Sequence, residues 1–133
     1  MAGENVERHH EVYDAFNRGD TDAFLALMDD EVEWTPRSLE MEGGSAYKGH
    51  AGVARWRQEW HRIFPDWTAE TAKVRDLGGP TLATLHLRGS GGESGTPVTQ
   101  TIWHLAEWRA GKVVRLSAHE SEAKALEVVG LRK

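Results

Sequence analysis

The first half of the chain carries apolar residues at helical spacing. Between residues 6 and 17 an apolar residue recurs every few positions, which predicts an amphipathic helix. Gly19 stands where a helix usually ends, and Asp20 or Thr21 can cap a second helix. A third helix is predicted to end before Pro65, because a proline interrupts the helical hydrogen bonds. The apolar residues of the three stretches are Val6, Val12, Tyr13 and Phe16, then Phe24, Leu25, Leu27 and Met28, then Val53, Trp56, Trp60, Ile63 and Phe64.

The tripeptide Arg18-Gly19-Asp20 lies between the first two predicted helices. Its letters match a well-known cell-adhesion signal. They also suit a glycine that ends one helix and an aspartate that caps the next. We therefore interpret the tripeptide as a helix stop followed by a helix start.

Strands are predicted for most of the remaining chain. Apolar and polar residues alternate there, with glycine-rich and proline-containing turns between the runs. Arg109-Ala110-Gly111 is predicted to be a short hairpin loop with glycine in the left-handed position. A terminal helix is predicted over Ser121–Val129, and residues 37–45 and 89–95 are predicted to be loops. The predicted strands are Glu31–Thr35, Trp67–Val74, Leu82–Arg88, Val98–Trp108 and Lys112–Glu120.

A three-residue hairpin fixes how the last two strands pair, and therefore which side chains share a face. Both faces mix apolar and polar residues, so we expect helices to cover one face and a partner to cover the other. The predicted pairs are His104 with Leu116, Ile102 with Ala118, and Gln100 with Glu120. One face holds Val98, Gln100, Ile102, His104, Ala106, Trp108, Val114, Leu116, Ala118 and Glu120, and the other holds Thr99, Thr101, Trp103, Leu105, Val113, Arg115, Ser117 and His119.

Composition narrows the classes of function. The length of 133 residues fits one domain spanning 1–133, and a net charge of -5 argues against a nucleic-acid partner. The chain has no cysteine and no apolar run near the roughly 20 residues of a membrane span. No pair among the seven histidines has metal-site spacing, so no metal is expected. The polar N-terminus lacks a signal-peptide pattern, which favours a cytoplasmic protein.

Helices followed by an antiparallel sheet form an α+β layout. Four segments in this order carry a family resemblance: YDAFNRGDTDAFLALMDDEVEW, YKGHAGV, IFPDW and WRAGKVVRLSAHESEAKALEVVGL. Through them the chain resembles the SnoaL-like branch of the nuclear transport factor 2-like superfamily over nearly its whole length. This resemblance implies a cone: a curved antiparallel sheet wrapped around the N-terminal helices, with a pocket open at one end. It also implies a homodimer paired through the outer sheet face, where Trp103, Leu105, Arg115 and His119 are predicted.

The reactions of this superfamily do not carry over residue by residue. In similar ketosteroid isomerases, a helix tyrosine, an aspartate base and a sheet aspartic acid do the work. Those positions fall here on Val12, on Thr35 or Pro36, and on His104. In similar limonene-epoxide hydrolases, the last-strand aspartate falls on Ala118. Function must therefore be argued from the site itself.

His104 and Glu120 are the candidate proton carriers on the predicted pocket face. A histidine titrates near neutral pH, and an apolar pocket raises the pKa of a carboxyl group. Gln100 could orient Glu120. The two candidates lie on the order of 13 Å apart at the strand rise per residue, so a substrate would have to bridge them. The alternative is that His104 is a core histidine and Glu120 lies at the solvated mouth.

Aromatic residues are the second signal of a pocket. Trp56 and Trp60 share one helix face, and the chain has six tryptophans in all. These rings either line a pocket for a flat apolar ligand or fill the core of the cone. The predicted ligand-binding residues are Phe16, Trp34, Tyr47, Trp56, Trp60, Phe64, Gln100, Ile102, Leu116 and Ala118.

Three functions follow from these features. The first is a cofactor-independent enzyme, an isomerase or aldol-type cyclase, acting on a small cyclic carbonyl compound through His104 and Glu120. The second is a binding protein for a small apolar or aromatic molecule. The third is a dimeric interaction module without a ligand. A cavity that exposes both ionisable groups favours the first, a cavity without them favours the second, and a filled interior favours the third.

Overall fold

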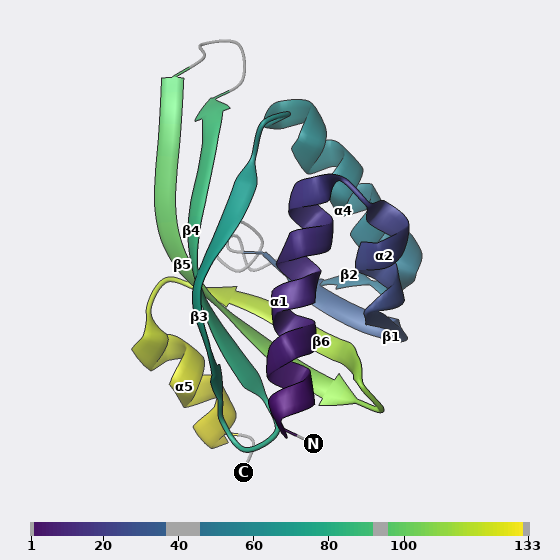
Figure 1. Cartoon of the computed structure of the whole chain (residues 1–133), viewed down its shortest axis with the longest axis vertical. Helices are drawn as coiled ribbons and strands as arrows, with labels where there is room; N and C mark the ends of the chain where they lie inside the picture. Colours follow the sequence, from purple (N-terminus) through teal and green to yellow (C-terminus); the bar gives the residue numbers. More distant parts are fainter. Residues whose placement is uncertain (1, 37–45, 92–95, 132–133) are drawn as a thin grey trace.

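The computed structural model describes residues 2–36, 46–91 and 96–131 (Figure 1). No helix among them combines the length and apolar character needed to cross a membrane. The loop expected over 37–45 and most of the glycine-rich connection lie outside these residues. The elements are α1 (Ala2–Arg18), α2 (Thr21–Ala26), β1 (Met28–Thr35), β2 (Tyr47–Lys48), α4 (Gly49–Ile63), β3 (Thr68–Asp76), β4 (Thr81–Gly91), β5 (Thr96–Arg109), β6 (Lys112–His119) and α5 (Glu122–Leu131).

The turn between α1 and α2 confirms the reading of Arg18-Gly19-Asp20. Gly19 has a φ of 73°, a conformation that favours glycine, and so ends α1. The Asp20 carboxylate accepts a hydrogen bond from the Ala23 amide at 3.0 Å and caps α2. Helix α2 is shorter than predicted, because Met28 already belongs to β1.

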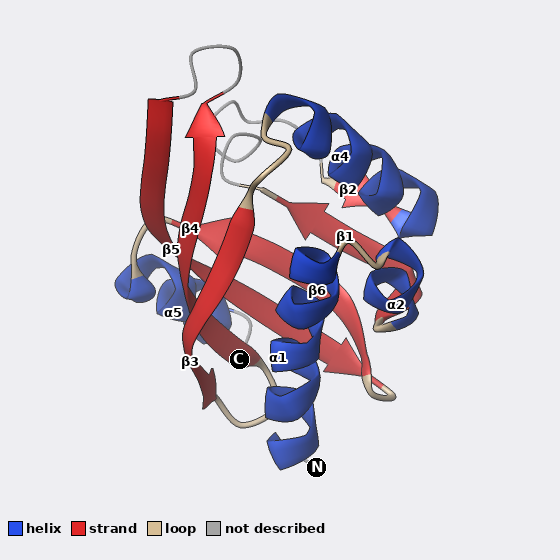
Figure 2. Ribbon diagram, turned by 45° about the horizontal axis from the view of Figure 1, so that its top comes forward, coloured by secondary structure: helices blue, strands red, loops and turns tan. Residues whose placement is uncertain are grey.

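A curved sheet of six strands forms the centre of the molecule, in the order β2-β1-β6-β5-β4-β3. Neighbouring strands are antiparallel except β1 and β6, which run parallel. Helices α1, α2 and α4 cover one face, and α5 lies on the opposite face (Figures 1 and 2). This is the predicted α+β cone, with an open, mostly antiparallel sheet.

The register predicted for β5 and β6 was wrong by two residues. Arg109 pairs with Lys112, so the loop is Ala110-Gly111 alone, with φ angles of 51° and 76°. Positive φ at both loop residues is the geometry of a tight two-residue hairpin. The shorter loop moves the pairing by one residue, so Trp108 lies opposite Val113, and Val113, predicted on the outer face, is fully buried in the inner core.

A bulge in β6 adds the second residue of the register shift. The pairing shifts again between Glu107 and Trp108, which leaves Val114 as the extra residue. His104 therefore lies opposite Ala118 rather than Leu116, and Leu116 and Ala118 lie on the inner face as predicted. Strand β6 ends at His119, so Glu120 has no partner position across from Gln100.

The sheet carries a hydrophobic core on each face. The inner core is large and joins α1, α2 and α4 to the sheet. The outer core is small: Leu82, Leu105 and Ala125, with partly buried neighbours from α5. The outer face, expected to be covered by a partner, is thus partly covered by the chain's own last helix.

Candidate functional site

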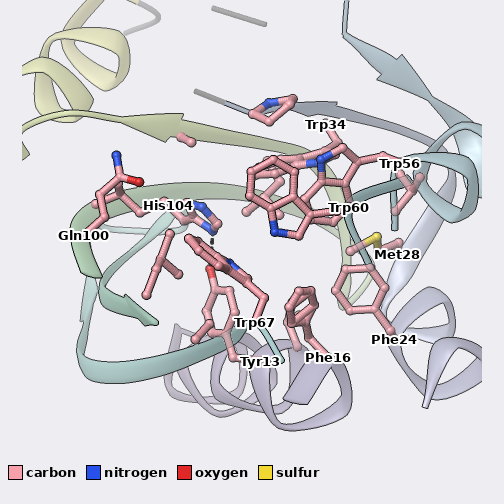
Figure 3. Close-up of a pocket in the computed structure, with 18 residues that line it drawn as sticks. Tyr13, Phe16, Phe24, Met28, Trp34, Trp56, Trp60, Trp67, Gln100 and His104 are labelled. Carbon is pink, nitrogen blue, oxygen red and sulfur yellow. Dashed lines mark hydrogen bonds between the residues drawn. The ribbon is translucent and has the colours of Figure 1, made fainter. Parts of the chain in front are cut away.

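A cavity of about 280 Å³ lies between the inner sheet face and the three helices that cover it (Figure 3). Its lining is predominantly apolar. Gln100 is exposed and marks the solvent side, whereas most other lining residues are buried. The lining residues are Val12, Tyr13, Phe16, Phe24, Met28, Trp34, Pro36, Val53, Trp56, Trp60, Trp67, Ala69, Leu87, Gln100, Ile102, His104, Leu116 and Ala118.

Four tryptophans form a continuous aromatic wall around this cavity. Ring centroids lie 5.1 Å apart for Trp34 and Trp56, 6.2 Å for Trp56 and Trp60, and 5.4 Å for Trp60 and Trp67. Two of the three contacts are edge-to-face, a favourable arrangement for aromatic pairs. Gly89 makes room for Trp67, because an added Cβ would lie 2.5 Å from its ring. Rigid rings held in this way line space rather than collapse into it.

The polar part of the cavity wall is a buried hydrogen-bonded chain. Tyr13 Oη lies 2.9 Å from His104 Nδ1 and 2.8 Å from His9 Nε2. His9 Nδ1 lies 2.8 Å from Thr81 Oγ1. The Trp108 indole N–H donates to the same Thr81 oxygen at 2.8 Å. Five side chains from α1, β4 and β5 are thereby joined, so the orientation of His104 is fixed from behind.

Burial controls the charge of this chain. Desolvation lowers the pKa of His104 to about 3, and the neighbouring His119 lowers it further in the same direction. The pKa of His9 is likewise lowered to about 3, chiefly by burial and then by His104. Burial raises the pKa of Tyr13 well above its usual value. All three side chains are therefore neutral at pH 7.

Three nitrogen atoms near the cavity have no hydrogen-bond partner among the described residues. One is Nε2 of His104, because the hydrogen bond of that ring to Tyr13 uses Nδ1. The others are the buried indole nitrogens of Trp34 and Trp60. An indole N–H can only donate a hydrogen bond.

The structure brings together most of the site residues predicted from the sequence. Those that line it are Phe16, Trp34, Trp56, Trp60, Gln100, Ile102, His104, Leu116 and Ala118.

Three predicted site residues lie elsewhere. Glu120 is exposed beyond the end of β6 and forms an ion pair with Lys124 on α5. It lies on no part of the cavity lining because β6 is shorter than predicted. Tyr47 packs against the core from β2. The Phe64 ring contacts Trp60 and Trp67 but does not line the main cavity; it borders a smaller cavity of about 140 Å³.

Tyr13, His9 and Thr81 were missed as parts of the site. His9, Tyr13 and Phe16 recur at helical spacing on the buried face of α1, which could have placed His9 on that face. The contact of Tyr13 with His104 joins residues 91 positions apart, so local spacing gives no sign of it.

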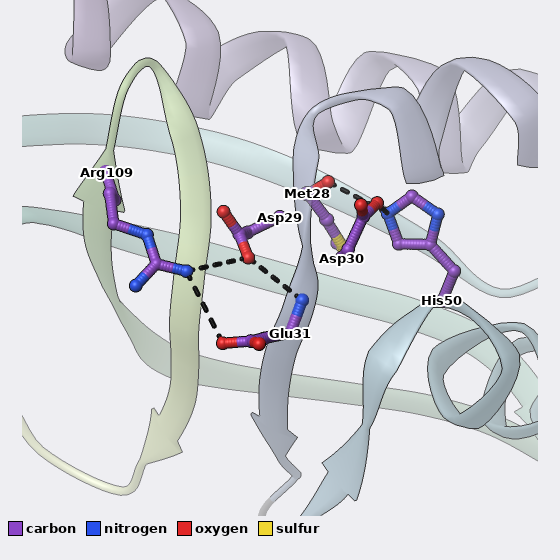
Figure 4. Close-up of polar contacts among 6 residues, drawn as sticks. All are labelled: Met28, Asp29, Asp30, Glu31, His50 and Arg109. Carbon is purple, nitrogen blue, oxygen red and sulfur yellow. Dashed lines mark hydrogen bonds and ion pairs between the residues drawn. The ribbon is translucent and has the colours of Figure 1, made fainter.

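A separate group of polar contacts lies at the start of β1 (Figure 4). Arg109 Nη2 lies 3.0 Å from an Asp29 oxygen and 3.7 Å from Glu31. His50 donates from Nε2 to the Met28 carbonyl at 2.9 Å. The hydrogen bond from the Glu31 amide lowers the pKa of Asp29, and Arg109 adds to this effect. These contacts fasten β1 to the β5–β6 hairpin and to α4.

Residues 2–36, 46–91 and 96–131 contain no candidate metal site. No three histidine or acidic side chains gather there in a way that could hold an ion.

Solved structures share this fold at low sequence identity. An NTF2-like protein of unknown function from Burkholderia pseudomallei is 20% identical, with a TM-score of 0.78, covering 95% of this chain and 97% of that one. TerC, co-crystallised with polyporic acid, is 20% identical with a TM-score of 0.78, covering 96% and 98%. A ketosteroid isomerase-like protein from Catenulispora acidiphila, in complex with trimethylamine, is 14% identical with a TM-score of 0.76, covering 93% and 92%.

None of the curated proteins compared with the chain matches it. A family profile does, and it covers more than half of the sequence. The SnoaL-like domain matches residues 9–116, which include most of α1, all of α2 and α4, and every residue of the cavity lining except Ala118. The chain therefore belongs to the SnoaL-like family of the nuclear transport factor 2-like fold.

Proposed function

We propose that this protein binds a small ring compound in the cavity, with the compound's one polar group placed against His104. The observation that carries the proposal is a largely apolar cavity of about 280 Å³, walled by tryptophans. Its wall includes His104, whose Nδ1 is hydrogen-bonded and whose Nε2 has no partner among the described residues. Cavities of this kind take ligands whose surface is mostly apolar and whose orientation is set by few polar contacts.

The size of the cavity supports a compact ligand. Its volume of about 280 Å³ lies just below the roughly 300–1,000 Å³ of typical ligand pockets. Two similar structures contain, by name, polyporic acid or trimethylamine. Polyporic acid is therefore one probe for this chain, together with the smaller bicyclic ketone 1-tetralone.

Isomerase or cyclase chemistry is the weaker proposal. Such chemistry needs a group that takes a proton near neutral pH. Among the described lining residues, Tyr13 and His104 are the ionisable ones, and burial moves both pKa values away from neutrality. Glu120, the second proton carrier expected from the sequence, lies outside the lining.

Calorimetric titration with 1-tetralone and polyporic acid tests the binding proposal. Ala118→Leu should abolish binding. Ala118 lines the cavity beside His104, its partner on the neighbouring strand, and a leucine side chain there would fill the space that the ligand needs. Thr99→Leu is the matched control, since Thr99 is exposed on β5. It should bind both probes as the unchanged chain does.

Two results would contradict the proposal. One is the absence of heat with either probe at millimolar concentration. The other is equal binding by the Ala118→Leu and Thr99→Leu variants, which would place the probes outside the cavity.

We propose separately that two copies pair through the outer sheet face. Of the four residues expected there, Leu105 and His119 are buried within one copy. Trp103 is half-buried and Arg115 is exposed, and they are the ones that remain for a contact. Trp103→Glu should shift sedimentation from dimer to monomer; an unchanged dimer would rule out this surface.

A further inference from the structure

The buried chain behind His104 has a direction. A hydroxyl group carries one O–H, and a neutral imidazole carries one N–H and one bare nitrogen. When all of its hydrogen bonds are satisfied, each group in the chain therefore donates to one neighbour and accepts from the other. Tyr13 contacts two histidines through a single oxygen. Its hydrogen therefore goes either to His104 or to His9, and the two choices give His104 opposite tautomers.

The far end of the chain decides between these directions. Trp108 Nε1–H can only donate, and it donates to Thr81 Oγ1. Thr81 is fully buried, and its hydroxyl contacts no other side chain than Trp108 and His9 among the described residues. The Thr81 hydrogen therefore goes to His9 Nδ1.

The remaining hydrogens follow in sequence. Because His9 accepts at Nδ1, its own hydrogen is on Nε2 and is donated to Tyr13 Oη. Tyr13 then donates to His104 Nδ1. In this arrangement His104 carries its hydrogen on Nε2, the nitrogen without a partner in the described part of the chain.

The opposite direction leaves a buried donor unsatisfied. His9 would donate from Nδ1 to Thr81, whose oxygen already receives the Trp108 N–H. The Thr81 hydroxyl hydrogen would then have no acceptor among the described side chains. Buried donors without a partner are unfavourable, and a fully paired alternative is present.

From this chain we infer that His104 presents a fixed Nε2–H donor to the cavity, and that the ligand places a carbonyl oxygen against it. The carbonyl contact rests on the proposed binding function. The tautomer of His104 does not depend on it. Trp108, Thr81, His9 and Tyr13 act through His104 and are positioning residues.

The surroundings of the cavity agree with an acceptor on the ligand. Burial lowers the pKa of His104, which keeps the ring neutral with one N–H. A cyclic ketone or quinone offers oxygen acceptors on an apolar ring framework, whereas a ring compound that only donates would meet another donor.

The tautomer can be read directly by nitrogen NMR of histidine side chains in the unliganded protein. The expected result is a protonated Nε2 and a bare Nδ1 in both His9 and His104, favoured by about tenfold or more. Protonated Nδ1 in both rings would mean the reversed chain and would overturn the inference. That result would not depend on whether any compound binds.

Thr81 variants test the origin of the direction. Thr81→Val removes the hydroxyl and should weaken the preference for Nε2–H in His104. Thr81→Ser keeps the hydroxyl and should preserve it. An unchanged preference in Thr81→Val, in a variant that remains folded, would show that Thr81 and Trp108 do not set the tautomer.

A matched pair of compounds tests the ligand class. The ketone 1-tetralone and its hydrocarbon counterpart tetralin differ in the carbonyl group. His104→Phe should weaken 1-tetralone binding about tenfold, the usual scale for one lost hydrogen bond, and leave tetralin nearly unchanged. Equal effects on both compounds would overturn the carbonyl contact. Binding of neither compound by the unchanged chain would instead count against the proposed function.

Discussion

The two faces of the sheet differ in how completely side chains fill the space beneath the covering helices. On the outer face, Leu82, Leu105 and Ala125 close into a small cluster beneath α5. On the inner face, large rings meet edge-to-face and leave a cavity of about 280 Å³. Aliphatic side chains fill the space available to them, whereas rigid rings supported by neighbouring rings leave a space of defined shape.

The two faces also differ in how they treat polar groups. The inner face buries two neutral histidines, a tyrosine and a threonine in one hydrogen-bonded chain. The outer cluster consists of aliphatic residues and alanine. Polar groups in a core are costly unless they are paired. The outer face buries one histidine, His119, whose Nε2 lies 2.7 Å from Ser117 Oγ on the same strand, whereas the inner chain of contacts joins three elements.

Acidification should have the largest effect, and it should act through the inner face. The unfolded chain protonates its histidines near pH 6.5, but His9 and His104 have pKa values of about 3 when folded. The unfolded state thus binds more protons between these values, and stability falls as the pH falls through this window. From pH 7 to pH 5 the two groups should cost about 4 kcal/mol in the free energy of unfolding.

Urea denaturation at pH 7, 6 and 5 measures this effect. His9→Gln should remove about half of the pH dependence, because one of the two titrating groups is gone. A free energy of unfolding that stays level between pH 7 and pH 5 would contradict neutral burial of both rings.

Truncation on the outer face should affect stability alone. Leu105 is 1% exposed, so Leu105→Ala should cost about 3 kcal/mol through lost burial and the cavity left behind. Binding of 1-tetralone should stay unchanged, because Leu105 lies on the face opposite the cavity. Chemical denaturation and calorimetry on the same variant separate the two effects; weaker binding would show that the faces are coupled.

Removal of the Tyr13 hydroxyl should have an intermediate effect. Tyr13→Phe leaves a nitrogen of His9 and a nitrogen of His104 without their partner, which should cost about 1–3 kcal/mol. Tyr47→Phe is the matched control, because the Tyr47 hydroxyl makes no hydrogen bond to the described residues. Equal melting temperatures of the two variants would contradict a structural role for the buried chain.

A change that touches neither face should have the smallest effect. Asp20→Ala removes the cap of α2 and should cost about 1 kcal/mol. Asp20→Asn keeps a capping oxygen and should be nearly neutral in thermal unfolding. An equal loss in both variants would point to the Asp20 charge rather than to the cap.

Local patterns were sufficient for the helices, for five of the six described strands and for the family, whereas the two-residue strand β2 (Tyr47–Lys48) was not predicted. The stop at Gly19 and the cap at Asp20 depend on residues next to one another in the chain. The apolar spacing of α1 and α4 likewise reflects one helix at a time. Features of this kind are set by propensity and periodicity, which a single sequence displays.

The site depended on distances along the chain that no local pattern records. Ala110 adopts a positive φ, which is uncommon for alanine, and this shortened the hairpin that fixes the register. The bulge at Val114 and the end of β6 at His119 then moved Glu120 away from Gln100. The docking of α5 on the outer face, and the contact of Tyr13 with His104, are likewise long-range.

The aromatic wall of four tryptophans has a consequence for fluorescence. Trp34, Trp56, Trp60 and Trp67 follow one another with centroid separations of 5.1 to 6.2 Å, and they are four of the chain's six indoles. At such distances an excited indole passes its energy readily to the next. A quinone or other quencher in contact with any of the four would therefore dim the emission of all, and the protein's ultraviolet fluorescence would report on its own cavity without a label.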